Sequence, residues 1–546
     1  MLAPLIQKLS LVWIGFTTVL LAHYIVHTLG THRTLRKIPG PAVSTLLWGE
    51  EWDLFHSKPG SLYVNWHGRF GRVVSFTGAF GHQILSITDP RAIHFILGEG
   101  AYQFPKPAGV RAWFKATLGE GILWVEGKVE HEFQRRLLVP ALNQTSVRGL
   151  TSIFLETSLY MADQWTKLLE NHETDQLEIE ITYWAGRFAL DTIGRAAFGH
   201  DFNCLSGDPH ELAEALDGLT NNEHRPSSFY MRALFWIFPS ILFIGKKGQM
   251  IREVKRRLGS EAKRMWSDTK TLQDSGNQTL MANMLRCDDS SQMTEEEVVS
   301  QMRTVISAGY ETVSAIVAWM LFEISIHPKF QEQLRLEIAS IPEPTFDQLN
   351  TKFPLLDAAL KETLRLHPAI LENHHEVFVS PSTSNDKHFY LSTQAAQTIT
   401  VPLSEPLAET GEMRLVVPAG TLISIPVNVL QTDKEIWGDD ADEFQPSRWL
   451  EGGKGVATLP KGRELFAFSA GPRSCIGKSF AMAEIKVGFS HKIHAKLTVM
   501  QALMITLLQR FSFQCKHEIE PFQSFVIRPR VKGENASSLP LLVTRL

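Results

Sequence analysis

A glycine-rich segment around one cysteine constrains this 546-residue chain more than any other feature. The segment reads Phe-Ser-Ala-Gly-Pro-Arg-Ser-Cys-Ile-Gly from Phe468 to Gly477, and good helix formers follow from Lys478 to Lys486. Its glycines let the backbone come close to a bulky group where a side chain would collide. The start of the predicted helix and the N–H groups of the turn would stabilise a deprotonated thiol. The pattern therefore predicts that Cys475 is a thiolate metal ligand, and a buried structural cysteine is the alternative.

The metal that suits this loop is iron in a flat macrocycle. A thiolate ligand pushes electron density onto haem iron and favours cleavage of the O–O bond. Arg473 would pair with a carboxylate of the macrocycle. The segment resembles the cysteine-ligand loop of the cytochrome P450 family. The resemblance implies a bound haem b, with Cys475 on the iron and with Phe468, Arg473 and Gly477 in the cofactor site.

A second motif lies upstream, inside an apolar helical pattern from about Glu295 to His327. It reads Ala-Gly-Tyr-Glu-Thr and ends at Thr312. We expect Gly309 to leave room for a ligand against the helix backbone. An ordinary core helix is the alternative. In the family that this chain resembles, such an acid–alcohol pair lines the oxygen pocket, which implies that Glu311 and Thr312 deliver protons.

Two further segments agree with the resemblance in order and spacing. Glu362 and Arg365 stand three apart on one face of a predicted helix and look like the family's buried ExxR pair. The Phe-Gln-Pro-Ser-Arg-Trp segment at 444–449 resembles the stretch whose arginine, here Arg448, completes that network. The role implied for these three residues is structural, behind the cysteine loop.

The remaining motif concerns the carboxylates of the haem. His131 and Arg135 are four apart on one helix face and resemble the family's WxxxR pattern, with histidine in place of tryptophan. The resemblance implies that both contact a haem carboxylate. Family members often carry another arginine after the Leu-His-Pro turn, where this chain has His374 and His375. Which residue replaces that arginine stays open.

Residues 1–37 predict a membrane anchor with a basic flank. The stretch from Leu9 to His32 has no Asp, Glu, Lys or Arg and is long enough to cross a bilayer. Three basic residues follow between positions 33 and 37, so the positive-inside rule places the domain 38–546 in the cytosol. We therefore expect a single-pass protein of the endoplasmic reticulum membrane. A cleaved signal peptide is the alternative.

The rest of the chain predicts a mainly α fold with small β-sheets, the cytochrome P450 fold preceded by a transmembrane helix. Residues 151–327 show a mostly helical pattern, whereas 73–87 alternates like a hairpin and 413–427 like short strands. Four widely spread cysteines do not form a disulfide framework. The formal charge of −4 carries no signal for nucleic-acid binding.

Two stretches interrupt the resemblance, residues 377–394 and residues 487–501. The second splits the helix predicted after the cysteine loop. Each begins with Val and ends with Gln, residues whose codons can supply the GT and AG ends of an intron. Our hypothesis is that both are introns retained in frame. True surface insertions are the alternative, because loops tolerate added length well.

The function implied by the resemblance is a monooxygenase that inserts one oxygen atom of O2 into a lipophilic small molecule. Electrons would come from NADPH through NADPH–cytochrome P450 reductase, with cytochrome b5 as a further partner. The sequence style resembles fungal members of secondary metabolism, which implies terpenoid or polyketide substrates by analogy. The alternatives are a haem-thiolate isomerase or dehydratase that needs no reductase, and a non-catalytic product if both insertions are real.

Overall fold

The structure is a computed structural model, and it describes residues 35, 37–142, 146–147, 149–220, 226–271, 279, 293–341, 348, 352–377, 398–450, 465–482 and 499–546. The predicted span from Leu9 to His32 lies outside these residues, as does most of each suspected insertion. The chain divides into two compact units. The first comprises residues 1–57, 61–107 and 374–426, and the second residues 58–60, 108–373 and 427–546.

The first unit contains the predicted β-structure. Its main sheet has the order β1-β2-β7-β4, with β1 and β2 paired antiparallel and β2 and β7 parallel. The hairpin predicted for 73–87 is confirmed, with Val73 opposite Ile87, and so are the strands predicted within 413–427. The strands are β1 (Val73–Thr77), β2 (Gln83–Ile87), β4 (Glu372–Glu376), β5 (Thr398–Pro402), β6 (Arg414–Pro418) and β7 (Leu422–Pro426), and the helices are α2 (Glu51–His56), α3 (Ser61–Phe70) and α4 (Pro90–Leu97).

The second unit is mostly helical, as predicted. Its longer helices are α5 (Ala108–Thr117), α6 (Lys128–Leu142), α8 (Thr151–Glu170), α9 (Ile181–Ile193), α10 (Glu211–Thr220), α11 (Pro226–Leu234), α12 (Gly245–Thr271), α14 (Glu295–Ile326), α15 (Pro328–Ala339), α17 (Pro354–Leu366) and α21 (Val499–Arg510). Shorter helices are α18 (Val427–Gln431), α19 (Lys434–Trp437) and α20 (Lys478–Met482), with 3-10 turns η3 (Cys204–Ser206), η6 (Pro446–Trp449), η8 (Phe466–Phe468) and η9 (Gly471–Arg473). One sheet has the order β3-β11-β8 and another pairs β9 with β10; the strands are β3 (Gln176–Glu180), β8 (Phe511–Gln514), β9 (Ile519–Gln523), β10 (Ile527–Val531) and β11 (Pro540–Arg545).

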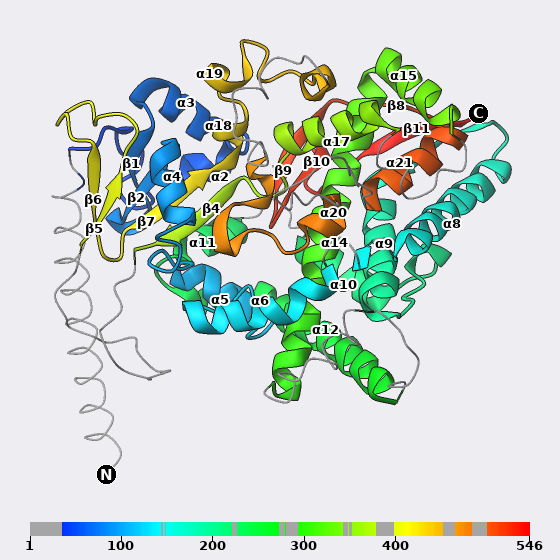
Figure 1. Cartoon of the computed structure of the whole chain (residues 1–546), viewed down its shortest axis with the longest axis horizontal. Coiled ribbons are helices and arrows are strands. Elements are labelled where there is room, and N and C mark those ends of the chain that lie inside the picture. Colours follow the sequence, from blue (N-terminus) through cyan, green and yellow to red (C-terminus); the bar gives the residue numbers. More distant parts are fainter. Residues whose placement is uncertain are drawn as a thin grey trace, which may run out of the picture. The chain divides into compact units, whose positions relative to one another are not determined.

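Helix α14 is the core of the second unit. It begins with a capping box, in which Thr294 and Glu297 each bond the backbone N–H of the other, and three glutamates in its first turn complement the helix dipole. It packs against α9, α12, α17 and strand β10 (Figure 1). In the part of the chain that the structure describes, α14 is the helix long and apolar enough to cross a membrane, but 72% of its most apolar window is buried in the protein. Its apolar length therefore serves the core.

Two ends of the suspected insertions are visible. Val377 is buried, and its N–H donates to the carbonyl of Thr421 at 3.1 Å. Helix α20 ends at Met482 and α21 begins at Val499. Residues 499–501, the last three of the second suspected insertion, therefore form the first turn of α21, where Gln501 is buried.

Candidate active site

The cysteine loop is held by its own backbone. The N–H of Cys475 donates to the carbonyl of Phe468 at 2.9 Å and closes the turn. Two residues within the turn have left-handed backbones, Ser469 with φ of 57° and Gly471 with φ of 71°. Glycine adopts such a conformation freely, so Gly471 is required by the turn itself. The spacing of the motif therefore reflects one local chain reversal that presents the thiol.

The surroundings of the Cys475 thiol act on its pKa in two directions, and burial has the largest effect. Burial raises the pKa of Cys475, whereas N–H groups of Gly477 and Lys478 and the positive charges of Arg135 and Lys478 act in the opposite direction. Cys475 as a residue is exposed, so the loop is open to another group at this position. A Cβ on Gly477 would lie 3.7 Å from the Cys475 sulfur, an ordinary contact. The thiol alone does not require glycine at position 477.

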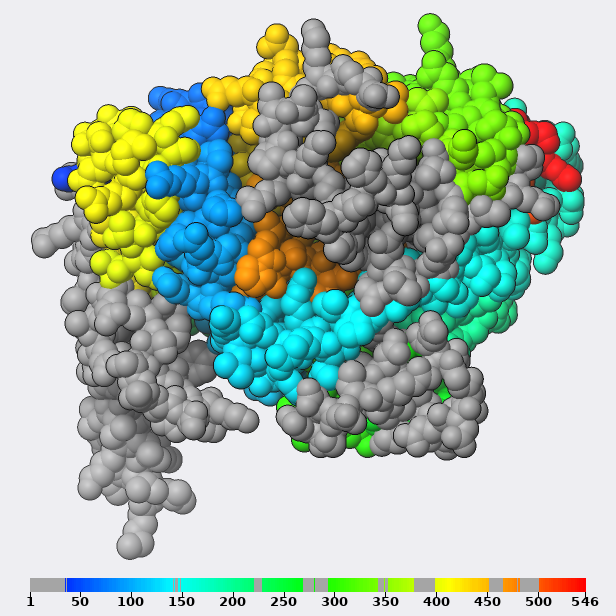
Figure 2. Space-filling model, in the orientation of Figure 1, coloured from blue at the N-terminus to red at the C-terminus, as the bar shows by residue number. Residues whose placement is uncertain are grey.

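Helix α6 contacts the loop through Arg135. Its guanidinium donates to the carbonyl of Ser474 at 2.7 Å and to the Ser474 hydroxyl at 3.3 Å. Figure 2 shows the segment around Cys475, coloured orange, beside the cyan segment that contains α6. His131, one turn earlier on α6, is buried. Of the predicted pair, Arg135 thus contacts the cysteine loop directly.

A carboxylate that the sequence did not indicate pairs with Arg473. Glu126, just before α6, accepts from the Arg473 guanidinium, and both side chains are largely buried. The pair joins the loop before α6 to the turn that holds Cys475. Phe468, on the other side of that turn, is buried beneath the Lys478 ammonium, which lies 5.8 Å from the ring centroid.

Helix α14 is less buried at the second motif than in the stretches on either side of it. Ala308 is exposed and Thr312 partly exposed, in the middle of a helix that is buried on either side. The Thr312 hydroxyl donates to the carbonyl of Ala308 at 2.8 Å, a bond that competes with the helical ladder. The expectation for Gly309 is wrong. A Cβ there would lie 3.0 Å from the side chain of Ile193, so this glycine allows close packing of α9 instead.

The second predicted proton carrier is buried next to a cation. Glu311 accepts a hydrogen bond at 3.2 Å from Arg528 of β10. Burial raises the pKa of Glu311 to about 7, partly offset by the charge of Arg528. Sequence reasoning missed Arg528, which stands 217 positions away on a strand. The carboxyl therefore exchanges its proton near neutral pH.

His374 and His375 lie in strand β4, in the part that belongs to the first unit. The Nδ1 of His375 lies 3.0 Å from the carbonyl of Phe104. This contact lies within the first unit, and the role of both histidines at a haem carboxylate stays a prediction.

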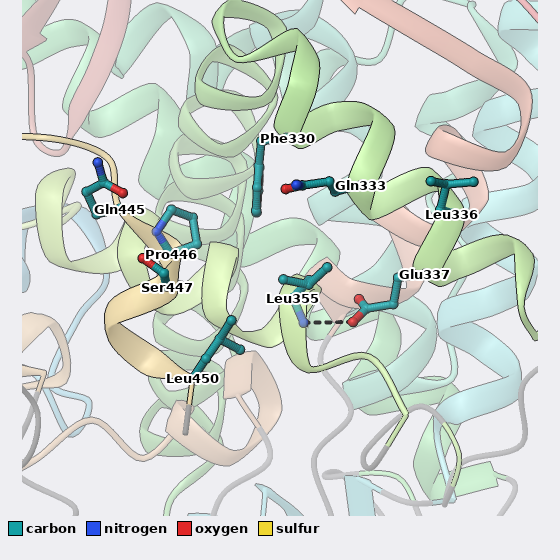
Figure 3. A pocket seen from close by; sticks show the side chains of 9 residues that line it. All are labelled: Phe330, Gln333, Leu336, Glu337, Leu355, Gln445, Pro446, Ser447 and Leu450. Carbon is teal, nitrogen blue, oxygen red and sulfur yellow. Dashed lines mark hydrogen bonds between the residues drawn. The ribbon is translucent and has the colours of Figure 1, made fainter. Parts of the chain in front are cut away.

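An open depression of about 710 Å³ lies along α15 and α17 (Figure 3). Its lining residues are Phe330, Gln333, Leu336, Glu337, Leu355, Gln445, Pro446, Ser447 and Leu450. The Glu337 carboxylate accepts from the N–H groups of Leu355 and Leu356 at 2.8 and 3.0 Å, which satisfies the start of α17. The charged group of the depression, Glu337, is therefore occupied by helix capping, and we assign no ligand to the depression.

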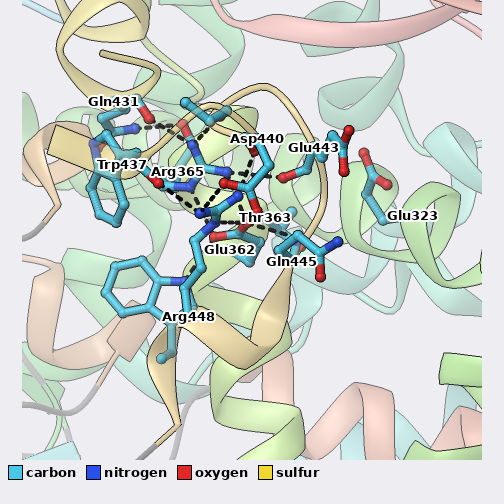
Figure 4. Close-up of polar contacts among 12 residues, drawn as sticks. Glu323, Glu362, Thr363, Arg365, Gln431, Trp437, Asp440, Glu443, Gln445 and Arg448 are labelled. Carbon is cyan, nitrogen blue, oxygen red and sulfur yellow. Dashed lines mark hydrogen bonds and ion pairs between the residues drawn. The ribbon is translucent and has the colours of Figure 1, made fainter. Parts of the chain in front are cut away.

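The ExxR prediction is confirmed in full (Figure 4). Glu362 and Arg365 form two hydrogen bonds of 2.8 Å and are completely buried, and Arg448 reaches Glu362 at 3.2 Å. Gln431 extends the network, since its amide donates to the carbonyl of Arg365 at 2.8 Å while its oxygen accepts from the N–H of Ala467 at 3.1 Å. Ala467 directly precedes the cysteine loop, so the network supports that loop from behind.

Comparisons with known proteins agree with this geometry. A family model described as Cytochrome P450 matches residues 36–391 and 403–495. The chain is 29% identical to cytochrome P450 monooxygenase claQ of Ampulloclitocybe clavipes, over 96% of this chain and 95% of the relative. It is also 29% identical to cytochrome P450 monooxygenase 205 of Postia placenta, over 93% of this chain and 92% of the relative.

Proposed function

The chain belongs to the cytochrome P450 family and is similar over its length to fungal monooxygenases, and on that premise we propose that it oxidises a lipophilic small molecule with O2. The observation that carries the proposal is the environment of Cys475, an exposed residue whose thiol lies near two backbone N–H groups and two cations. By analogy with fungal members, the substrate class is terpenoid or polyketide, in secondary metabolism.

The residues around the thiol fit haem b. Arg135 and Lys478 supply positive charge beside a sulfur that must be an anion to bind iron. Because burial raises the pKa of Cys475, loss of its proton would be coupled to metal binding. Arg135 and Arg473 flank the loop and are the candidates to bind the two haem carboxylates. When bound, haem supplies the activation of dioxygen.

Two residues of α14 would handle protons. The Thr312 hydroxyl is accessible and can exchange its bond to the Ala308 carbonyl for a bond to a ligand or water. Glu311 has a pKa of about 7, which lets one carboxyl both accept and release a proton at neutral pH. We assign Thr312 as the alcohol and Glu311 as the acid of one pair that delivers protons.

The proposal also covers the redox partners of the protein and its location in the cell. Electrons would come from NADPH through NADPH–cytochrome P450 reductase, with cytochrome b5 as a further partner. Lys478 lies close enough to Cys475 to act on its charge and would be a docking point for an acidic protein. Residues 1–37 would anchor the protein in the endoplasmic reticulum membrane with the catalytic domain in the cytosol. The sequons at Asn143, Asn277 and Asn535 should then carry no glycan. An endoglycosidase-dependent change in mobility would contradict this topology.

The direct test replaces the proposed iron ligand. Cys475→Ala should abolish the thiolate-type spectrum of the reduced protein with carbon monoxide. The matched control is Cys515→Ala, because that cysteine is also unpaired and only half-buried. An unchanged spectrum in Cys475→Ala would reject the assignment. Turnover of substrate without reductase or NADPH would instead favour the isomerase or dehydratase class.

A further inference from the structure

A buried network of charges surrounds Glu311. Arg528 donates to the Glu311 carboxylate at 3.2 Å and to the Ser314 hydroxyl at 3.3 Å. The same guanidinium lies 5.8 Å from the ring centroid of Tyr310, whose hydroxyl donates to Asp217 of α10. Asp217 also accepts from Arg187 of α9 at 2.5 Å. Two carboxylates and two guanidinium groups thus lie around one tyrosine.

The fold holds Arg528 in place from both sides. The carbonyl of Ile527 accepts from the Trp319 indole at 3.1 Å, and its N–H donates to the carbonyl of Ala369 at 2.9 Å. These bonds fix the start of β10 against α14, so that the next side chain points at Glu311. Arg528 and Glu311 are 2% and 4% exposed at the side chain, which leaves little water to screen their interaction.

The position of Tyr310 is likewise fixed by its packing. A Cβ on Gly186 of α9 would lie 3.1 Å from the Tyr310 hydroxyl, so glycine makes the space for that group. The hydroxyl therefore reaches Asp217 of α10, whose side chain is 23% exposed. Asp217 is the member of the network with contact to solvent, whereas Glu311 has almost none.

The side chains of the network differ in whether their protonation state can change. Arg187 and Arg528 stay charged at every relevant pH. Burial and the charge of Asp217 raise the pKa of Tyr310 well above its usual value, so it stays neutral. Asp217 accepts hydrogen bonds from the Arg187 guanidinium and the Tyr310 hydroxyl. Glu311 is therefore the group whose charge is decided by its neighbours.

We propose that Arg528 and Asp217 are positioning residues that set the protonation of Glu311 in opposite directions, with Arg528 favouring the carboxylate and Asp217 the carboxylic acid. The proposal rests on the proposed function, because it concerns how the acid of the delivery pair is tuned. The physical reason is the sign of each charge: a nearby cation stabilises an anion, and a nearby anion destabilises it.

The test measures Glu311 itself in the full-length protein. The infrared band of a protonated carboxyl, assigned to Glu311 by its loss in Glu311→Gln, is titrated against pH. Wild type should lose the band around pH 7. Arg528→Gln should move the midpoint up by about one pH unit, and Asp217→Asn should move it down, each a roughly tenfold change in the ratio of the two forms. Arg528→Lys keeps the cation and should keep the midpoint.

The opposite signs separate electrostatic positioning from loss of structure. If Arg528→Gln and Asp217→Asn leave the midpoint unchanged or move it in the same direction, the proposal is wrong. Circular dichroism checks that each variant folds, and Arg528→Lys with Asp217→Asn still decides the matter if Arg528→Gln does not fold. The readout needs neither substrate nor electron donor. Failure of the proposed function would appear separately, as a missing thiolate spectrum in wild type.

Discussion

Replacing Arg365 by lysine should destabilise the second unit strongly although the charge is kept. The Arg365 guanidinium donates twice to Glu362 at 2.8 Å and also bonds the carbonyls of Gln431, Ala441 and Glu443 at 2.8, 2.5 and 3.1 Å. Lysine has one nitrogen with three donors and cannot reproduce this planar fork. Several buried acceptors would therefore lose their partner.

The expected cost follows from the burial of the pair. Both side chains of the ion pair are fully buried. Each buried acceptor left unsatisfied costs about 1–3 kcal/mol, and breaking a buried ion pair costs about 3–5 kcal/mol, so we expect a loss near 3–5 kcal/mol. Unfolding entropy is about 2.1 cal/mol/K per residue, so a chain of this size loses roughly 1 °C in Tm per kcal/mol. The Tm should fall by about 3–5 °C.

The chain supplies a matched control for this experiment. Arg335 has the same spacing to Glu332, with a contact of 2.5 Å, but its partner is 58% exposed. Its other hydrogen bonds are 3.3 Å or longer. An exposed pair contributes about 0.2–1 kcal/mol, so Arg335→Lys should lower the Tm by about 1 °C or less. Thermal unfolding followed by circular dichroism measures both variants, and equal shifts would refute the reasoning.

Three further outcomes are expected. Thr312→Ala should keep the thiolate spectrum but divert NADPH-derived electrons to peroxide, because an accessible hydroxyl is lost beside Glu311; full coupling of NADPH oxidation to product would exclude the role. Burial raises the pKa of Asp191 from 3.8 to about 6, so the folded state binds its proton more tightly and stability should fall as pH rises from about 4 to 6. Asp191→Asn should flatten the Tm over that window, and a profile identical to wild type would contradict this. Transcripts across 377–394 and 487–501 should show both stretches removed, and deleting both should raise haem occupancy; mature messages that retain them, with a normal spectrum from the full-length protein, would identify true insertions.

Features set by near neighbours in the chain could be predicted from the sequence. Glu362 and Arg365 are three residues apart, and helix geometry alone puts them together. The same holds for the cysteine loop, where the turn from Phe468 to Cys475 closes on itself. The capping of α14 by Thr294 and the 73–87 hairpin are equally local. Each depends on backbone geometry over a few residues, which a residue pattern records directly.

Gly309 shows where such a pattern becomes ambiguous. A glycine in a helix next to Thr312 indicates close approach of something to the backbone. The sequence does not say whether that is a ligand or another helix, and the structure places Ile193 of α9 there. The pattern therefore predicted the close approach correctly and its partner wrongly.

What the sequence determined by itself is the family and the local turns and helices around Cys475. Only the tertiary structure decided the partners of the charged groups, such as Glu126 for Arg473, Arg528 for Glu311 and Arg187 for Asp217. These pairs join residues far apart in the chain, and any of the chain's many Asp, Glu, Lys and Arg residues could have formed them. A buried charge needs a partner of opposite sign, because little water is present to stabilise it. The tertiary packing decides which residue lies close enough to be that partner.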